Sequence, residues 1–444
     1  MPRLILGHTT DDSIKIWVRG TKRWPVAFVS VLDEQGKPAG VGQAALQLNE
    51  DNFFTGVVKW CGLRADQRYK VKVAFGKTIN TSPENRIRER YTNGHFSTFP
   101  LAATREPFTF LFGSCNLHSM GLLEWWLRND EAWKRVSQVG KETHARFMLH
   151  CGDQIYADIP WWPSASVDHY RKKYIDAWED CVPAQAVLTE MPHYMILDDH
   201  EITDDFDRST SAAAGNGLLN AALKAYWEFQ DQHNPDTPGL PRRYYYDFRC
   251  GSARFFVMDT RFRRESKSKQ MIDIAQMSKL KQWLTSDRDD LKFVVTSVPF
   301  VGHVRSKRDR QDKWSGRAYR SQREEVLGHI FKHDVKGVVF LTGDMHASYC
   351  AKMDISDGTR QVSVHELMSS PINQFTPDSS LAELFESPKT LTRGNGITMT
   401  STIDPNSYYN HSNIMTVTVD DRQVSYAIHR TTWVETGPSG AFTP

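Results

Sequence analysis

The sequence has no long hydrophobic run and no excess of charge of either sign. No stretch reaches the roughly 18 consecutive apolar residues that a transmembrane helix needs. The 55 basic and 53 acidic side chains nearly cancel, giving a formal net charge of +2. This balance gives no case for a nucleic-acid or membrane-surface partner, so we expect neither.

Paired cysteines and a recognisable leader segment are also lacking. The six cysteines are scattered along 444 residues without a CxxC pair, a usage typical of reduced thiols in the cytosol. The N-terminus lacks a charged segment followed by an apolar segment and a small-residue cleavage site. We therefore predict a cytoplasmic protein, with an exported and processed form left open.

Residues 1–104 contain a series of short β-type runs separated by turn signals, the pattern of an antiparallel β-sandwich. Leu63 and Tyr69 resemble the tyrosine corner of fibronectin type III domains, or are a generic leucine and tyrosine at a strand entry. Residues 98–107, with two prolines, are the predicted linker. The main runs are 13–18, 27–32, 55–60 and 69–74.

After the linker, strands alternate with helices, and four apolar runs end in residues of metal-ligand type. The carboxyl ends of parallel strands meet at one edge of a sheet, where α/β proteins build their sites. A single strand end of this kind is commonly a plain turn, but four such strand ends in one chain favour a shared site. The residues at these ends are Cys115 and Asn116; Asp153 and Tyr156; Asp198, Asp199, His200 and Glu201; and Asp344 and His346.

These motifs together resemble a known family. Gly-Asp-x-x-Tyr, Asp-Asp-His-Glu and Gly-Asp-x-His, preceded by Gly-Ser-Cys, are similar to the alkaline phosphatase D (PhoD-like) family of calcineurin-like metallophosphoesterases. The resemblance implies an α/β fold, an αββα four-layer sandwich of two mixed sheets, over residues 105–444. A fibronectin-III-like β-sandwich domain over residues 1–104 would precede it.

The residue types at the strand ends predict two metal positions. Asp153, in the central motif, can give one oxygen to each ion. Thiolate and phenolate ligands favour Fe(III), and a set of carboxylates favours Ca, Mn or Mg. The resemblance likewise implies iron plus calcium. The predicted ligands are Cys115, Asp153, Tyr156 and His346 for the first position, and Asp153, Asp199 and Asp344 for the second.

Two further residues are predicted to act on the substrate. By resemblance, His200 protonates the leaving alkoxide or stabilises the phosphoryl oxygens; the alternative is a histidine that fixes a metal ligand. Arg261 follows a strand of the same sheet, where its guanidinium can grip phosphate or pair with Asp259. The carboxylates predicted to orient the ligands are Asp198, Glu201 and Asp204.

The predicted function is hydrolysis of small-molecule phosphomonoesters or phosphodiesters by attack of a metal-bound hydroxide. A catalytically inactive metal-binding scaffold of the same fold is the alternative. A metallo-amidase or oxygenase is a third interpretation, which leaves the aspartate-rich position unexplained. The sequence leaves open the ester preference, the second metal and the oligomeric state.

Three segments near the predicted site carry open interpretations. The insertion 160–192 is predicted to be a lid or rim, although its aromatic residues at helical spacing also fit a core. The basic run 305–320 is either a solvated loop or a phosphate-attracting flap. Ser297 and His303 stand where the family has a different residue pair and a ligand histidine, so their role at the second position stays open.

Overall fold

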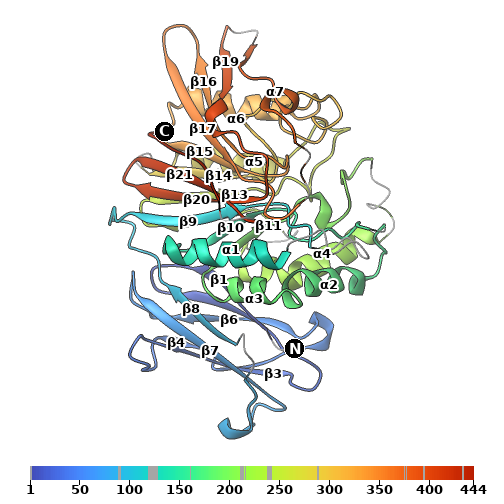
Figure 1. Ribbon diagram of the computed structural model, residues 1–444, viewed down its shortest axis with the longest axis vertical. Helices are drawn as coiled ribbons and strands as arrows, with labels where there is room; N and C mark the ends of the chain where they lie inside the picture. Colours follow the sequence, from blue (N-terminus) through green and yellow to red (C-terminus); the bar gives the residue numbers. More distant parts are fainter. Residues whose placement is uncertain are drawn as a thin grey trace.

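The computed structural model of the chain describes residues 3–88, 92–118, 129–160, 162–210, 215, 217–237, 243–287, 290–374, 376, 378–393, 396–432 and 435–444. Its strands form four sheets, two small and two large. The N-terminal strands lie at one end of the molecule, and helices α1 to α4 lie between them and the larger sheets (Figure 1). The predicted mixed α/β class is confirmed.

The N-terminal strands form two small antiparallel sheets that share one core. Side chains of alternate residues, such as Val71 and Val73, face that core, which explains the period-two pattern of the sequence. The Tyr69 hydroxyl accepts a hydrogen bond of 2.9 Å from the backbone N–H of Arg64, the type of contact that a tyrosine corner makes. One sheet contains β1 (Arg3–Thr9), β2 (Ile14–Arg19), β6 (Thr55–Cys61) and β4 (Val41–Gly42); the other contains β5 (Ala45–Gln47), β3 (Val26–Leu32), β7 (Arg68–Gly76) and β8 (Asn93–Ser97).

The first large sheet has six strands, of which β9, β10 and β11 are parallel to one another. The C-terminal hairpin joins this sheet, because β20 pairs antiparallel with β9. In order across the sheet, the strands are β11 (His193–Ile196), β10 (Met148–Cys151), β9 (Phe108–Gly113), β20 (Asn413–Asp420), β21 (Gln423–Arg430) and β22 (Thr436–Phe442).

The second large sheet has eight strands, and β13, β14, β15 and β17 are parallel. All five residues of β14 are buried, as expected for a parallel strand covered on both faces. In order, the strands are β12 (Tyr246–Cys250), β13 (Ala253–Val257), β14 (Leu291–Val295), β15 (Val338–Thr342), β17 (Gln361–Met368), β16 (Tyr349–Ser356), β19 (Thr398–Ile403) and β18 (Lys389–Thr392).

An aromatic core joins the two large sheets. Phe110 of β9 meets Phe255 of β13 and Phe293 of β14 edge to face, with ring centroids 5.4 and 5.5 Å apart. All three rings are fully buried. Because aromatic pairs of this kind stabilise beyond their buried area, this core fixes how one sheet lies on the other. It therefore also fixes how their strand ends meet.

Helices cover the outer faces of both large sheets. Trp133, Val136 and Val139 of α1 (Asn129–Glu142) pack in one core with β9 and β10. Met277, Leu280 and Trp283 of α5 (Ile274–Thr285) pack with the eight-stranded sheet. In the part of the chain that the structure describes, no helix is both long enough and apolar enough to cross a bilayer. The remaining helices are α2 (Val167–Tyr174), α3 (Val182–Leu188), α4 (Leu218–Phe229), α6 (Arg320–Lys332) and α7 (Leu381–Leu384).

The insertion 160–192 differs from its predicted role as a lid. Tyr174 of α2 and Trp178, in the helical turn Ile175–Glu179 that follows, are buried in a core shared with Trp17 of β2 and Phe229 of α4. None of the insertion's described residues lines the cavity at the strand ends. The aromatic residues at helical spacing thus form a core that joins the small sheets to the rest of the molecule. Trp161, also part of this insertion, lies outside the described residues.

Candidate metal centre

The loops that follow β9, β10 and β15 are joined to one another by backbone hydrogen bonds. The N–H of Cys115 donates to the carbonyl of Gly152 at 3.2 Å, and the N–H of Asn116 donates to the carbonyl of Asp153 at 2.8 Å. The N–H of Asp344 donates to the hydroxyl of Ser114 at 3.2 Å. The strand ends of both large sheets therefore meet at one place, as the motifs predicted.

Two glycines in the motifs allow this close approach. A Cβ atom on Gly152 would lie 2.5 Å from Cβ of Asp198, and the residue has a φ of +92°. A Cβ atom on Gly343 would lie 2.2 Å from the Ser114 hydroxyl oxygen. Both distances are shorter than any tolerated contact. Close packing therefore requires glycine before each aspartate, in addition to the chemical requirement for the aspartate itself.

Four of the predicted metal ligands have a left-handed backbone. Their φ angles are +59° for Cys115, +55° for Asp153, +77° for Asp344 and +50° for His346. Non-glycine residues adopt this region rarely, at a cost on the order of 1–3 kcal/mol each, and such residues cluster at functional sites. The turns aim these side chains back toward a common point.

Four carboxylates form the centre of the arrangement. Asp153, Asp198, Asp199 and Asp344 each offer an oxygen, and these atoms all lie within 4.8 Å of one another. Burial, followed by the charges of Cys115 and Asp198, raises the pKa of Asp153 well above its usual value. Burial in the same cluster raises the pKa of Asp344 to about 7. A cation bound among these oxygens would remove the repulsion, so the cluster fits a hard metal ion.

A thiol and a phenol lie on one side of this cluster. The Cys115 sulfur is 3.4 Å from Oδ2 of Asp153. Tyr156 is buried with Cys115, and burial together with the charges of Cys115 and Asp153 raises its pKa well above 10. Burial lowers the pKa of His346 to about 4, so this ring is neutral, the form that binds metals. These donors suit a more strongly Lewis-acidic ion than the carboxylate cluster does.

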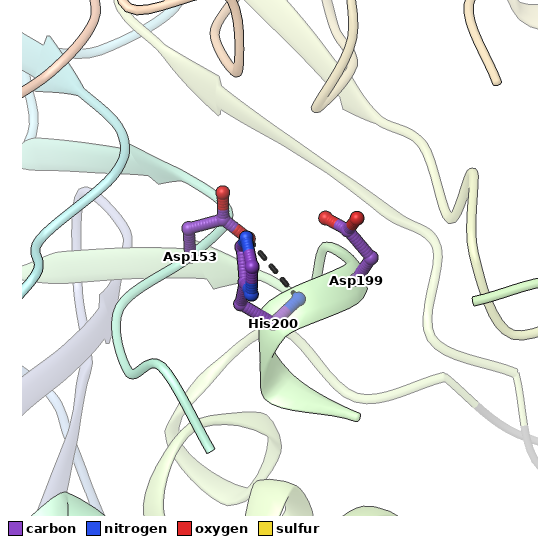
Figure 2. A group of neighbouring side chains, drawn as sticks. All are labelled: Asp153, Asp199 and His200. Atoms are coloured by element: carbon purple, nitrogen blue, oxygen red, sulfur yellow. Dashed lines mark hydrogen bonds between the residues drawn. The ribbon is translucent and has the colours of Figure 1, made fainter. Parts of the chain in front are cut away.

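His200 lies between two of the carboxylates. Figure 2 shows Asp153 and Asp199 on either side of it, with its backbone N–H directed at Oδ1 of Asp153 at 3.4 Å. Its Nδ1 is 2.8 Å from Oδ1 of Asp158, and its ring lies on that of Tyr156. Although burial opposes the charged form, the carboxylates of Asp199 and Asp158 raise the pKa of His200 well above 6.5.

Arg261 lies beneath the cluster. Its side chain is fully buried and pairs with the Asp198 carboxylate through Nε, while Nη2 donates to Oδ2 of Asp312 at 2.9 Å. Oδ1 of the Asp259 carboxylate accepts from the backbone N–H groups of Arg261 and Phe262. This geometry favours a role in holding carboxylates in place over direct contact with phosphate.

A comparison with family models decides the relationship. The model of the PhoD-like phosphatase family matches residues 124–427, more than half of the chain.

The chain belongs to the PhoD-like phosphatase family.

Individual relatives of this PhoD-like chain are distant in sequence. Alkaline phosphatase D of Bacillus subtilis (strain 168) is 22% identical over 401 residues, which cover 79% of this chain; the chain spans only 64% of that relative's length. A structure of PhoD aligns with a TM-score of 0.77 at 18% identity, covering 99% of this chain and 90% of the other. Purple acid phosphatase PPD1 from yellow lupin (Lupinus luteus) seeds aligns with a TM-score of 0.62 at 14% identity, covering 100% of this chain and 74% of the other. These structures show a shared fold, and the resemblance inferred from the motifs is confirmed.

The PhoD-like motifs open into a cavity of about 370 Å³. Its lining includes six site residues found by sequence, together with residues that sequence reasoning missed, among them Asp205, Asp312 and Lys313. A larger cavity of about 680 Å³ lies between the small sheets and α1, but it contains none of the predicted site residues. The six predicted residues in the smaller cavity are Asp153, Asp199, His200, Asp204, Asp344 and His346.

The structure shows where the basic run 305–320, Ser297 and His303 lie, whose roles the sequence left open. In the basic run, residues 307–309 are exposed, as a solvated loop would be, whereas residues 312–316 are buried and Asp312 and Lys313 line the cavity. Attraction of phosphate by this run stays a prediction. The Ser297 hydroxyl donates to Oδ1 of Asp198 at 2.9 Å, next to the cluster. His303 instead contacts Arg310, with 2.9 Å between its Nε2 and the guanidinium. Only Ser297 of this pair contacts the carboxylate cluster.

Glu201 ties two of the ligand loops together. Its carboxylate accepts from the backbone N–H groups of Asp153 at 3.0 Å, Gln154 at 2.6 Å and Asp198 at 2.7 Å. Three donors on one buried carboxylate fix the β10 and β11 loops relative to each other. These contacts support the predicted orienting role of Glu201, which stays a prediction.

We expect Glu201→Gln to weaken metal binding by about 10–100-fold, the usual effect of losing a group that orients ligands. The new amide would place its own N–H groups against backbone donors. Equilibrium dialysis with Mn²⁺ measures the affinity, and thermal unfolding measures stability. Glu228→Gln, at a buried glutamate of α4 that pairs with Arg171, should lose stability but keep its metal affinity. Unchanged metal affinity in Glu201→Gln would rule out the orienting role.

Proposed function

We propose that this chain is a metal-dependent phosphoesterase that hydrolyses small-molecule phosphomonoesters or phosphodiesters. The observation that carries the proposal is the buried group of four carboxylates beside a thiol and a phenol, at the wall of an open cavity. Membership of the PhoD-like phosphatase family supports the same reaction class. The name of the Bacillus relative, alkaline phosphatase D, supports it as well.

The donor set fits two metal positions. Asp153 would serve both, because it takes part in the carboxylate cluster and also contacts the Cys115 sulfur. Cys115, Tyr156 and His346 would complete an Fe(III) position, and Asp199 and Asp344 a position for Ca, Mn or Mg. When bound, such ions would neutralise the charge of the ester and activate the water that attacks phosphorus.

The residues of the chain supply the rest of the chemistry. His200 lines the cavity, and Asp158 holds its Nδ1, which leaves Nε2 to give a proton to the departing alkoxide. Glu201 and Arg261 keep the carboxylates in place from behind. No protein side chain acts as the nucleophile, so the phosphoryl group is transferred directly to water with inversion.

The same proposal includes the finer description of the fold. Residues 105–444 form an αββα sandwich, supported by the aromatic core between the two large sheets and by helices on their outer faces. Residues 1–104 form a fibronectin-III-like domain, supported by two antiparallel sheets and the hydrogen bond to Tyr69.

Elemental analysis of protein purified without added metal, combined with a panel of monoester and diester substrates, tests the function. The proposal requires two equivalents of metal and turnover of at least one ester class. A chelator should abolish this turnover. Stoichiometric metal with no turnover of any ester would instead identify a catalytically inactive scaffold.

We expect the protein purified without chelator to be coloured, because Fe(III) bound to phenolate or thiolate absorbs visible light. Tyr156→Phe or Cys115→Ala should shift or remove the band. Cys250→Ala is the matched control, since this thiol is equally buried but lies in β12, away from the site. Colourless, fully active protein with stoichiometric zinc or manganese would overturn the iron assignment and leave the phosphoesterase proposal standing.

A further inference from the structure

A buried lysine forms part of the cavity wall beside the carboxylates. The Lys313 side chain is 7% exposed and lines the cavity. Its ammonium contacts the carboxylate of Asp344 and donates to Oδ2 of Asp312 at 2.7 Å. Neither the motifs nor the family resemblance singled out this residue, which lies in the buried half of the basic run 305–320.

Lys313 shares one of its carboxylate partners, Asp312, with two arginines. Asp312 already accepts from Nη2 of Arg261 at 2.9 Å, and Nη1 of Arg264 lies 3.6 Å from the same oxygen. Three cations therefore share the Asp312 carboxylate.

The hydrogen-bonding capacity of Lys313 is not exhausted. An ammonium has three N–H donors, and the two carboxylates take two of them. The remaining donor belongs to a side chain that lines the cavity and so can meet a ligand there. Asp344 is one of the proposed metal ligands, so a ligand of Lys313 would lie next to the metal position.

We propose that Lys313 is a substrate-binding residue whose ammonium donates to a phosphoryl oxygen of the ester, next to the metal position that Asp344 completes. This inference rests on the proposed function and adds to it the group that recognises the phosphoryl oxygens. Hydrogen bonds between charged partners contribute about 1.5–3 kcal/mol, which corresponds to roughly 10–100-fold in affinity.

A second consequence concerns the metal. The ammonium of Lys313 and a divalent ion would share the Asp344 carboxylate, and two cations at one carboxylate repel each other. Removing the lysine charge should therefore strengthen divalent metal binding while weakening phosphate binding. A purely structural lysine would change both affinities in the same direction or neither.

The experiment uses metal-loaded full-length protein and inorganic phosphate as the probe, with binding measured by titration calorimetry. Lys313→Met should weaken phosphate binding at least about tenfold, and Lys313→Arg should keep it within about threefold. Arg308→Met removes an exposed cation from the same cavity and should cost less than about threefold. Lys332→Met, at an exposed lysine of α6, controls for the substitution itself.

Equilibrium dialysis with Mn²⁺ supplies a readout independent of phosphate, and tighter binding by Lys313→Met supports the proposal. Wild-type phosphate affinity in Lys313→Met would overturn it. Equal losses in Lys313→Met and Arg308→Met would also overturn it, because the effect would then reflect the general potential of the cavity. A wild-type protein that hydrolyses no ester refutes the proposed function instead. If Lys313→Met does not fold, Lys313→Gln takes its place in the same measurements.

Discussion

Asp153→Asn is expected to lower ester hydrolysis by at least about 10³-fold, since metal ions supply several kcal/mol of transition-state stabilisation. Asp153 is the only one of the predicted ligands that takes part in both the carboxylate cluster and the contact with the Cys115 sulfur. An asparagine side chain is neutral and has one oxygen, so it cannot serve two ions. The variant should therefore also lose at least one equivalent of metal.

The measurements are kcat/KM for a nitrophenyl monoester and a nitrophenyl diester, with elemental analysis of the same preparations. Asp421→Asn removes a carboxylate from an exposed ion pair with Arg105 and should change neither quantity, because surface ion pairs contribute little. A fully active, fully metallated Asp153→Asn protein would eliminate the bridging assignment.

His200→Ala is expected to slow hydrolysis of alkyl phosphates by about 10²–10⁴-fold, the range for loss of general acid catalysis. The rate of nitrophenyl phosphate hydrolysis should fall far less, because nitrophenolate leaves without needing a proton. The carboxylate of Asp158 holds Nδ1 of the ring, and the ring lines the cavity, so Nε2 is the atom placed to donate.

Comparing the two leaving groups separates the roles of His200. An equal loss for both would indicate stabilisation of the phosphoryl oxygens or positioning of a ligand. Asp158→Asn is a useful companion, since it removes the carboxylate that holds the ring and keeps the imidazole. It should show the same dependence on leaving group, to a smaller degree.

The location of the site could be predicted from sequence because it depends on a local rule. Parallel strands of one sheet present their carboxyl ends at one edge, so the residues after β9, β10 and β11 had to lie near one another. The residues after β15, in the other large sheet, join them because the two sheets pack together. The motifs also identified Asp153, Asp199 and Asp344, which the structure places in one carboxylate cluster. The packing of Gly152 and Gly343 shows why these positions carry glycine.

The remaining features depend on how the two large sheets pack, which no local pattern encodes. Asp198 was expected to orient ligands, yet its carboxylate belongs to the central cluster, because Arg261 from the other sheet holds it there. Lys313 lies in a basic run that looked solvated, and only the fold shows that its second half is buried. The insertion 160–192 was misjudged because position after a motif does not reveal the side to which a chain turns.

The order of strands in the six-stranded sheet has a consequence for protein synthesis. Strand β9, which carries Cys115 at its end, lies between β10 and β20, and Phe112 of β9 pairs with Met415 of β20. A chain leaving the ribosome therefore exposes Cys115 and Asp153 long before it contains Asp344 or the strand that completes the pairing of β9. For the proposed metal centre, the complete ligand set would exist only after translation has passed His346, so metal content would report whether a recombinant product is correctly assembled.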